Sequence, residues 1–338
     1  MRVLAVVSSV LLAGAMGVAN YPPNTVKAFP FSNGHLPAVT VPVNNPQTDA
    51  KIRLGRQLYF DTRLSSDNSI SCASCHKPDH GWADTGPVSE GVGHAKGGRN
   101  SPSVLNAAYS VLQFWDGRAI NLEKQAVGPI QNPVEMQLTM DMALGRLKGI
   151  PGYVSQFKDV FGTEPNEEGV AKAIAAFERT IVQMDTPYDR YLDGDRKAMS
   201  AAAVRGMALF NGRGHCTACH SGPYFSDGRF HNLGIGFSGG KFADEGRMIV
   251  TKDRKDLGAF KTPGLRGVAE TAPYLHDGSE ATLASVIDLY DRGGIQNPNL
   301  DRAMLPLNLT DREKHELVEF LKALSGPPLS SDKPELPE

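Results

Sequence analysis

The chain has 338 residues, 41% hydrophobic and 21% charged, which is the composition of a folded protein with one or two hydrophobic cores and excludes a disordered polymer. Its 35 Lys and Arg against 37 Asp and Glu leave a formal charge of -2, so the basic excess that nucleic-acid binding requires is missing. We therefore expect no nucleic acid among its partners. Thirty-five Gly and 23 Pro predict long ordered loops between helices.

The N-terminus has the pattern of an export signal. Arg2 precedes an apolar stretch over residues 3–16, and the small residues Gly17 and Ala19 form a cleavage site before Asn20. The stretch is short for a membrane span, and no later segment approaches about 18 uninterrupted apolar residues. We predict a signal peptide over residues 1–19 and a mature protein outside the cytoplasm with no membrane anchor. A buried N-terminal helix is the alternative.

Helices and loops account for the rest of the chain. Residues 20–49 contain six prolines and little periodicity, so we expect an extended arm on the surface. Segments 54–60 and 205–210 are alike and predict two short amphipathic helices, the pattern of a duplicated unit. An apolar stripe with helical period covers residues 170–181, and a capping box at Thr310 begins the last helix. Alternating strand patterns are nearly absent, so the predicted fold class is mainly α.

All four cysteines lie in two C-x-x-C-H motifs, at residues 72–76 and 216–220. The two thiols of such a motif can add to the two vinyl groups of one porphyrin, and the following His then lies under the iron as an axial ligand. Disulfides or a zinc site are the alternatives, but zinc held by four Cys does not require a His after each pair. The sequence therefore predicts two covalent c-type haems, held by Cys72, Cys75, His76, Cys216, Cys219 and His220.

Three further segments complete a family pattern: Phe-Trp-Asp-Gly-Arg at residues 114–118, Asn-Pro-Val-Glu-Met at 132–136 and Pro-Tyr-Leu-His-Asp-Gly at 273–278. With the two haem motifs, they resemble the bacterial di-haem cytochrome c peroxidase and MauG superfamily over most of the chain. The resemblance implies two cytochrome c-like domains with long irregular loops, each domain carrying one haem. It also implies that one iron reacts with hydrogen peroxide while the other exchanges electrons.

On this resemblance we divide the chain into a peroxidatic-haem domain at residues 50–190, a second-haem, electron-transfer domain at 191–326 and a flexible tail at 327–338. The family also implies a calcium ion between the domains. Its ligands would be Asn100 and the carbonyl oxygens of Thr271 and Pro273.

The resemblance gives roles to residues around the first haem, on Cys72 and Cys75. Glu135 and Gln125 would lie on its distal side, where a carboxylate can move a proton from the near to the far oxygen of peroxide. Gln125 could hold that oxygen by hydrogen bonding. Trp115 would lie between the haems and relay electrons, a role that is compatible with a packed core aromatic.

The sixth ligand of the second haem departs from the ordinary peroxidases of the family. They place a Met fourteen residues after the His of the 273–278 motif, whereas here the count from His276 leads to Tyr290, as in MauG-like proteins. Tyr290 continues an apolar helical stripe from Leu283, which fits an iron ligand and a core residue alike. With the resemblance we expect ligation, and a phenolate favours ferric or higher iron where a thioether favours ferrous iron.

Two further positions differ from relatives. Val92 stands where many peroxidases carry a distal His, which predicts an open first iron unless His94 or His80 swings in. Gly214 and His215 stand where MauG has a Trp that passes charge to its protein substrate. Methylamine dehydrogenase maturation is therefore not expected.

The leading prediction is a periplasmic di-haem peroxidase. It would reduce hydrogen peroxide at the N-terminal haem with electrons relayed through the second haem from a small redox protein, a cytochrome c or a cupredoxin. The first alternative is a MauG-like enzyme that oxidises side chains of a partner protein, and the second is a non-catalytic di-haem electron carrier. The sequence is compatible with a monomer or a homodimer.

Overall fold

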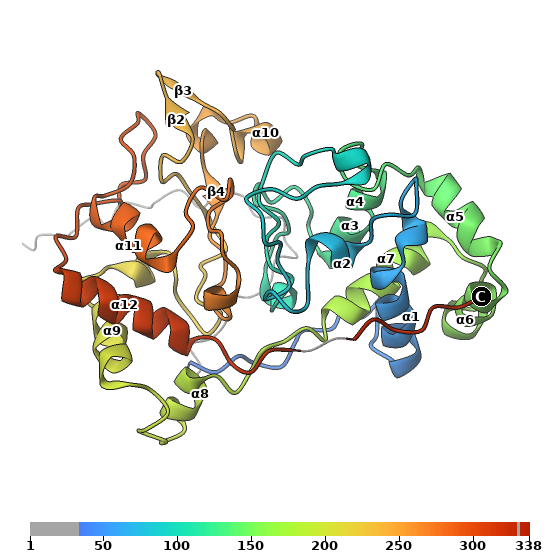
Figure 1. The fold of residues 1–338 in the computed structure, drawn as a ribbon, viewed down its shortest axis with the longest axis horizontal. Coiled ribbons are helices and arrows are strands. Elements are labelled where there is room, and N and C mark those ends of the chain that lie inside the picture. Colours follow the sequence, from blue (N-terminus) through green and yellow to red (C-terminus); the bar gives the residue numbers. More distant parts are fainter. Residues whose placement is uncertain (1–33, 330–331) are drawn as a thin grey trace, which may run out of the picture.

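The computed structural model describes residues 34–329 and 332–338, so the predicted signal peptide and the first part of the arm lie outside it. Figure 1 shows two halves side by side along the long axis of the molecule. Helices and loops form nearly all of both halves, and the strands are only two residues long. The prediction of a helix-rich fold with little sheet is therefore confirmed.

The elements follow one another in a simple order. The first half contains α1 (Asp49–Phe60), η1 (Thr62–Leu64), α2 (Cys72–Cys75), η2 (Val92–His94), η3 (Ala107–Tyr109), α3 (Leu122–Ala126), α4 (Gly128–Gln131), α5 (Met140–Lys148), α6 (Pro151–Phe161) and α7 (Glu167–Glu178). The second half contains α8 (Pro187–Leu192), α9 (Ala201–Asn211), η4 (Cys216–Ala218), α10 (Met248–Thr251), η5 (Arg254–Asp256), η6 (Val268–Glu270), α11 (Leu283–Asp291) and α12 (Asp311–Ala323). The antiparallel strand pairs are β1 (Phe230–His231) with β4 (Phe260–Lys261), and β2 (Phe237–Ser238) with β3 (Lys241–Phe242).

Side-chain caps fix where the long helices begin. Thr48 accepts a hydrogen bond from the backbone N–H of Lys51 at the start of α1, and Asn166 does the same for Gly169 in α7. Thr310 forms the predicted capping box of α12. Such caps satisfy backbone donors that have no partner within the helix, so they set the first residue of each helix.

Each half is built on one close crossing of two helices. A Cβ atom placed on Gly55 of α1 would lie 1.8 Å from the carbonyl oxygen of Ala173 in α7, and one placed on Gly206 of α9 would lie 1.8 Å from that of Glu316 in α12. Only glycine allows two backbones to approach this closely. Around each crossing lies a separate hydrophobic cluster, one of residues between 54 and 181 and one of residues between 199 and 324. The two halves therefore repeat one packing arrangement.

The two halves meet through a reciprocal pair of backbone hydrogen bonds. The N–H of Asn100 donates to the carbonyl of His276 at 2.7 Å, and the N–H of Lys261 donates to the carbonyl of Trp115 at 2.8 Å. In each half the donor stands two residues before a proline, and the acceptor stands 13 residues after that same proline, which is Pro102 in the first half and Pro263 in the second. The junction is thus formed by equivalent positions of the internal repeat.

The C-terminal segment does not form the loose tail that we expected. The N–H of Gly152 in α6 donates to the carbonyl of Glu338 at 2.9 Å, and the guanidinium of Arg63 donates to that of Pro337 at 3.1 Å. Residues 332–338 therefore return to the first half and lie against it (Figure 1). The segment is rich in proline and forms no helix, so its carbonyl groups are available to donors on the first half.

The arm before α1 also joins the halves. The carbonyl of Gly34 accepts a hydrogen bond from Arg266 in the second half, while the amide of Asn45 donates to Glu123 and to the carbonyl of Lys172 in the first. Asn45 is fully buried, so this part of the arm belongs to the core packing and is not only a surface strap. Within the described ranges, none of the helices is both long enough and apolar enough to cross a membrane.

The helix crossing gives a direct stability prediction. Gly55→Ala puts a methyl group against the backbone of α7, so the helices must separate, and we expect a loss of about 1–3 kcal/mol or more in the free energy of unfolding. Gly145→Ala in α5 is the matched control, because its Cβ meets no atom within 4 Å. That variant should gain about 0.5–1 kcal/mol from reduced chain entropy. Urea unfolding followed by circular dichroism measures both, and equal effects of the two variants would contradict the close crossing.

Candidate functional site: two cavities beside the cysteine motifs

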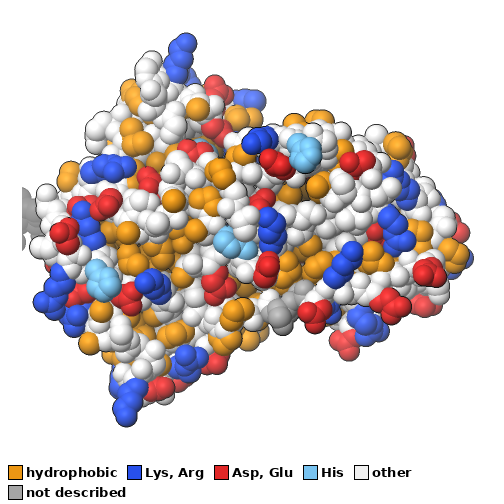
Figure 2. Space-filling view, viewed as in Figure 1, with side chains coloured by type: hydrophobic (Ala, Val, Ile, Leu, Met, Phe, Trp, Pro, Cys, Tyr) orange, Lys and Arg blue, Asp and Glu red, His pale blue; other side chains and the backbone are white. Residues whose placement is uncertain are grey.

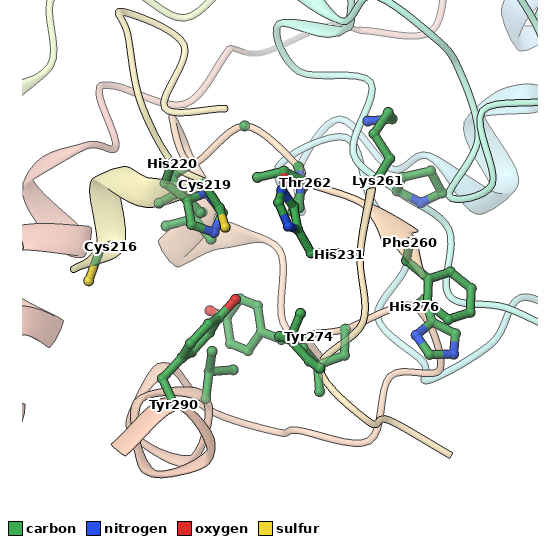
Figure 3. Close-up of a pocket in the computed structure, with 18 of the residues that line it drawn as sticks. Cys216, Cys219, His220, His231, Phe260, Lys261, Thr262, Tyr274, His276 and Tyr290 are labelled. Carbon is green, nitrogen blue, oxygen red and sulfur yellow. The ribbon is translucent and has the colours of Figure 1, made fainter. Parts of the chain in front are cut away.

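Each C-x-x-C-H motif opens onto a cavity. The first cavity is about 400 Å³ and the second about 280 Å³, close to the range of about 300–1,000 Å³ found for small-molecule sites. The first is lined by Cys72, Cys75, His76, Trp115, Gln125, Glu135 and Glu178, among others. The second, drawn in Figure 3, is lined by Trp115, Cys216, Cys219, His220, Lys261, His276 and Tyr290, among others.

The local backbone brings each His beneath its two cysteines. In both motifs the N–H of the His donates to the carbonyl of the first Cys, at 3.0 Å for His76 and at 2.8 Å for His220. Burial lowers the pKa of both imidazoles, so both rings are neutral near pH 7, which is the form that binds a metal. The Nδ1 of His220 bonds to the carbonyl of Phe225 at 2.9 Å, so in the neutral ring it carries the proton and Nε2 is free to act as a ligand.

These features decide between the alternatives for the cysteines. Cys72 and Cys75 line one cavity while Cys216 and Cys219 line the other, so the four sulfurs cannot share one zinc ion. Within each motif the two cysteines stand apart as free thiols. A cavity beside each pair and a neutral His at its end are what a covalently attached haem requires. The residues present therefore fit one c-type haem in each half.

Three residues of types that bind metals also lie close together at the second cavity, namely Cys219, Asp227 and His231. Both ring nitrogens of His231 are already engaged, Nδ1 with Asp301 at 2.6 Å and Nε2 with Asp227 at 2.9 Å. Burial lowers the pKa of this imidazole, but the hydrogen bonds from the two carboxylates outweigh it and raise the pKa to about 12. His231 is thus a partly buried imidazolium that lines the second cavity, and both of its ring nitrogens are occupied by carboxylates.

The distal residues predicted for the first haem do line the first cavity. Burial raises the pKa of the Glu135 carboxyl, while a hydrogen bond from Asn132 at 2.6 Å and the charge of Arg118 lower it. Gln125, on α3, lines the same cavity. A carboxyl group and an amide therefore share one chamber with His76, which is the chemistry that proton transfer to a bound oxygen species needs.

Neither of the two candidate distal histidines lines the first cavity. His94 has a side chain that is 91% exposed and contacts Glu90 at 3.3 Å, and His80 bonds to the carbonyl of Ala272 at 2.7 Å. Val92 is buried, and its N–H donates to the carbonyl of Glu135 at 2.8 Å. Residue 92 thus contributes backbone to the position of Glu135 and no ligand.

Tyr290 faces the second cavity from α11, and Figure 3 shows it and His220 reaching in from opposite sides. Burial raises the pKa of its phenol. The group is therefore protonated near pH 7, and coordination as a phenolate would require a metal to displace that proton. The phenol thus lies across the cavity from His220, a position that fits both an iron ligand and a packed core residue.

Trp115 lines both cavities. Its indole N–H donates to the carbonyl of Asn100 at 2.8 Å, and its ring meets the edge of His276 with centroids 6.4 Å apart. His276 in turn stacks on Phe260 at 3.5 Å. Trp115 is thus a packed aromatic residue at the junction of the two halves. The three predicted calcium ligands, Asn100, Thr271 and Pro273, all line the second cavity near this junction.

Glu178 is a site residue that the sequence reasoning missed. It is the last residue of α7, is 4% exposed and lines the first cavity, and its Oε2 has no hydrogen-bond partner among the described residues. Burial raises the pKa of its carboxyl to about 8, although Arg179 lowers it. A comparison of the two repeats could have found it. Phe177 contacts Gly55 as Phe320 contacts Gly206, so Glu178 corresponds to Leu321 in the second half. A charged residue at a position that is apolar in the other repeat is the signal.

Comparison with known proteins gives consistent matches. Residues 49–197 match the family model for di-haem cytochrome c peroxidase. The cytochrome-c peroxidase IdrP1 of Pseudomonas sp. (strain SCT) is 40% identical over 89% of this chain and 88% of its own length. The methylamine utilization protein MauG of Methylorubrum extorquens is 42% identical over 89% of this chain and 85% of its own. A crystal structure of a MauG-like protein associated with microbial copper homeostasis superposes with a TM-score of 0.80 and 32% identity, covering 87% of this chain and 94% of the other.

The burial of Glu178 predicts a pH dependence of stability. Its pKa is about 8 in the folded chain against an ordinary value of 4.5, so between these values the folded state holds more protons than the unfolded state. The free energy of unfolding contributed by this group is therefore lost as the pH rises from about 4.5 to 8. The difference in the free energy of unfolding between Glu178→Gln and the natural chain should therefore be more favourable to the variant at pH 8 than at pH 5, by at least about 1 kcal/mol.

Urea unfolding at the two pH values measures this difference, with Glu164→Gln as the control because Glu164 is exposed. The control should shift the free energy of unfolding equally at both values. Parallel pH curves for Glu178→Gln and the natural chain would show that Glu178 is not held protonated.

Proposed function

The chain belongs to the di-haem cytochrome c peroxidase and MauG family and is an oxidoreductase acting on peroxide, and we propose that it is a periplasmic enzyme of the Tyr-ligated, MauG-like branch. In this proposal Cys72, Cys75 and His76 would hold the haem at which hydrogen peroxide is reduced. Cys216, Cys219 and His220 would hold the haem that supplies a path for electrons from a small donor protein, a cytochrome c or a cupredoxin. The observation that carries the proposal is the difference between the cavities, since one contains a carboxyl and an amide and the other a phenol.

The overall reaction takes up two protons and two electrons and converts one hydrogen peroxide into two waters. The bound haems supply the iron that receives peroxide and the path for the two electrons. Glu135, as a carboxylate, takes the proton from the near oxygen of peroxide and delivers it to the far oxygen, so that the O–O bond breaks with loss of water. Asn132 fixes the carboxylate through its 2.6 Å hydrogen bond, and Gln125 holds the peroxide in place.

Trp115 supports electron transfer between the halves. Trp115 lines both cavities, as its neighbour Phe114 does. Its position is fixed because its indole N–H donates to the carbonyl of Asn100 and its backbone carbonyl accepts from the N–H of Lys261. A rigid aromatic group reorganises little when a charge passes. We also propose that calcium is held by Asn100 and the carbonyl groups of Thr271 and Pro273, where oxygen ligands from both halves would stabilise the junction.

Glu135 provides the central test of the reaction. Steady-state peroxide reduction with a reduced small cytochrome or cupredoxin should fall about 10²–10⁴-fold in Glu135→Gln, the usual size of a general acid–base contribution. Because the step needs the carboxylate and burial raises the pKa of Glu135, activity of the natural chain should rise with pH through a pKa above the ordinary 4.5. Glu164→Gln is again the control and should retain full activity.

The same experiment separates the alternatives. A MauG-like enzyme that oxidises a partner protein would give slow turnover with small donors and a mass change in one co-purifying protein. Gly214 and His215, at the position of the charge-passing Trp of MauG, do not support that function. A non-catalytic electron carrier would show no optical change on mixing with peroxide, which would exclude the proposed reaction.

Tyr290 gives a separate prediction for the second haem. If it is the sixth ligand, Tyr290→Phe should convert the second ferric haem to a form with an open or water-filled position, visible in optical and EPR spectra. Tyr290→Met should raise its reduction potential, because a neutral thioether favours ferrous iron. Resting spectra of Tyr290→Phe identical to those of the natural protein would show that the phenol is only a packed core residue.

A further inference from the structure

Lys261 is a half-buried lysine at the second cavity whose amine has no partner among the described residues. It is the last residue of β4, and its N–H bond to the carbonyl of Trp115 fixes its backbone at the junction. Its side chain lines the cavity with His220 and Tyr290. Figure 3 shows it across the cavity from Cys216.

The amine of Lys261 differs from the other cations of this region. Arg99 bonds to Asp116 and to Asp244, each at 2.6 Å, and Arg266 bonds to Asp189 at 2.8 Å. No hydrogen bond or ion pair involves the Nζ of Lys261 within the described parts of the chain. Burial lowers the pKa of this amine to about 8. A cation that is partly withdrawn from water and has no counter-charge costs free energy, and an anion in the cavity would offset that cost.

The internal repeat supplies independent support. Lys261 occupies the position of Asn100, since both donate their backbone N–H across the junction and both stand two residues before a proline. Asn100 is the proposed calcium ligand of the first half. The repeat therefore places an ammonium group in one half where the other half would hold a metal cation.

The position of the cysteines identifies the anion. In a c-type haem, the vinyl carbons bonded to sulfur lie on one side of the macrocycle and the two propionate carboxylates on the opposite side. Cys216 and Cys219 would fix the vinyl side, so a group across the cavity from Cys216 lies toward the propionates (Figure 3). We infer that Lys261 binds a propionate carboxylate of the second haem and that its charge raises the reduction potential of that haem. The sign follows because a nearby cation stabilises the reduced, more negative state.

This inference depends on the proposed haem at Cys216 and Cys219, and the test separates the two. Lys261→Met, which keeps the length of the side chain and removes its charge, and Lys261→Arg, which keeps the charge, are compared with the natural full-length protein. Haem content is measured first, and the reduction potential of each haem is then measured by spectroelectrochemistry. Lys255→Met, at an exposed lysine of the same half, is the control for loss of one charge.

The second haem of Lys261→Met should have a lower reduction potential than that of the natural protein, while Lys261→Arg and Lys255→Met should stay close to the natural value. Selective loss of the second haem from Lys261→Met, with both haems kept in Lys261→Arg, would also support the contact. An unchanged potential in a di-haem Lys261→Met chain, or loss of the second haem from both Lys261 variants, would refute it. A natural protein without haem would instead refute the proposed function.

Discussion

The reciprocal hydrogen bonds between Asn100 and His276 and between Lys261 and Trp115 are the constraint on which the site depends. They hold the loop after each haem motif against the loop of the other half, so the two cavities share a wall. Trp115 forms part of that wall and lines both cavities. Without this junction, the cavities of the two halves would not be joined by a shared residue.

The two halves show how one repeated frame can support two kinds of chemistry. The helix after the junction is interrupted in the first half, where α3 ends at Ala126 and α4 begins at Gly128, but runs on to Asp291 as α11 in the second. Counted from the junction, Tyr290 is the counterpart of Pro129, and each lines the cavity of its own half. Proline ends the helix and leaves the first cavity to Gln125 and Glu135, whereas the longer helix carries a phenol into the second. The two repeats thus differ at this point both in the length of the helix and in the side chain that faces the cavity.

The ionisable groups that line the two cavities also differ. The first cavity contains two carboxyl groups whose pKa values are raised by burial, Glu135 and Glu178, and both can hold protons near the reacting centre. The second cavity contains no such raised carboxyl among the described residues, but it has an imidazolium at His231 and the amine of Lys261. Carboxyl groups with raised pKa values therefore gather in the cavity where we propose the peroxide chemistry. Leu321, the apolar counterpart of Glu178, fits this division.

The sequence by itself determined the parts of this protein that depend on local spacing. The two C-x-x-C-H motifs, the helical periods and the capping box at Thr310 act over a few residues, so they could be identified without the fold. The segments around Trp115 and Glu135 identified the family by pattern. What the tertiary structure decided concerns contacts between distant residues: the return of residues 332–338 to the first half, the exposure of His94, the burial of Glu178 and the position of Lys261 at the second cavity. Burial and charge pairing depend on which segments meet in space, and no spacing along the chain contains that information.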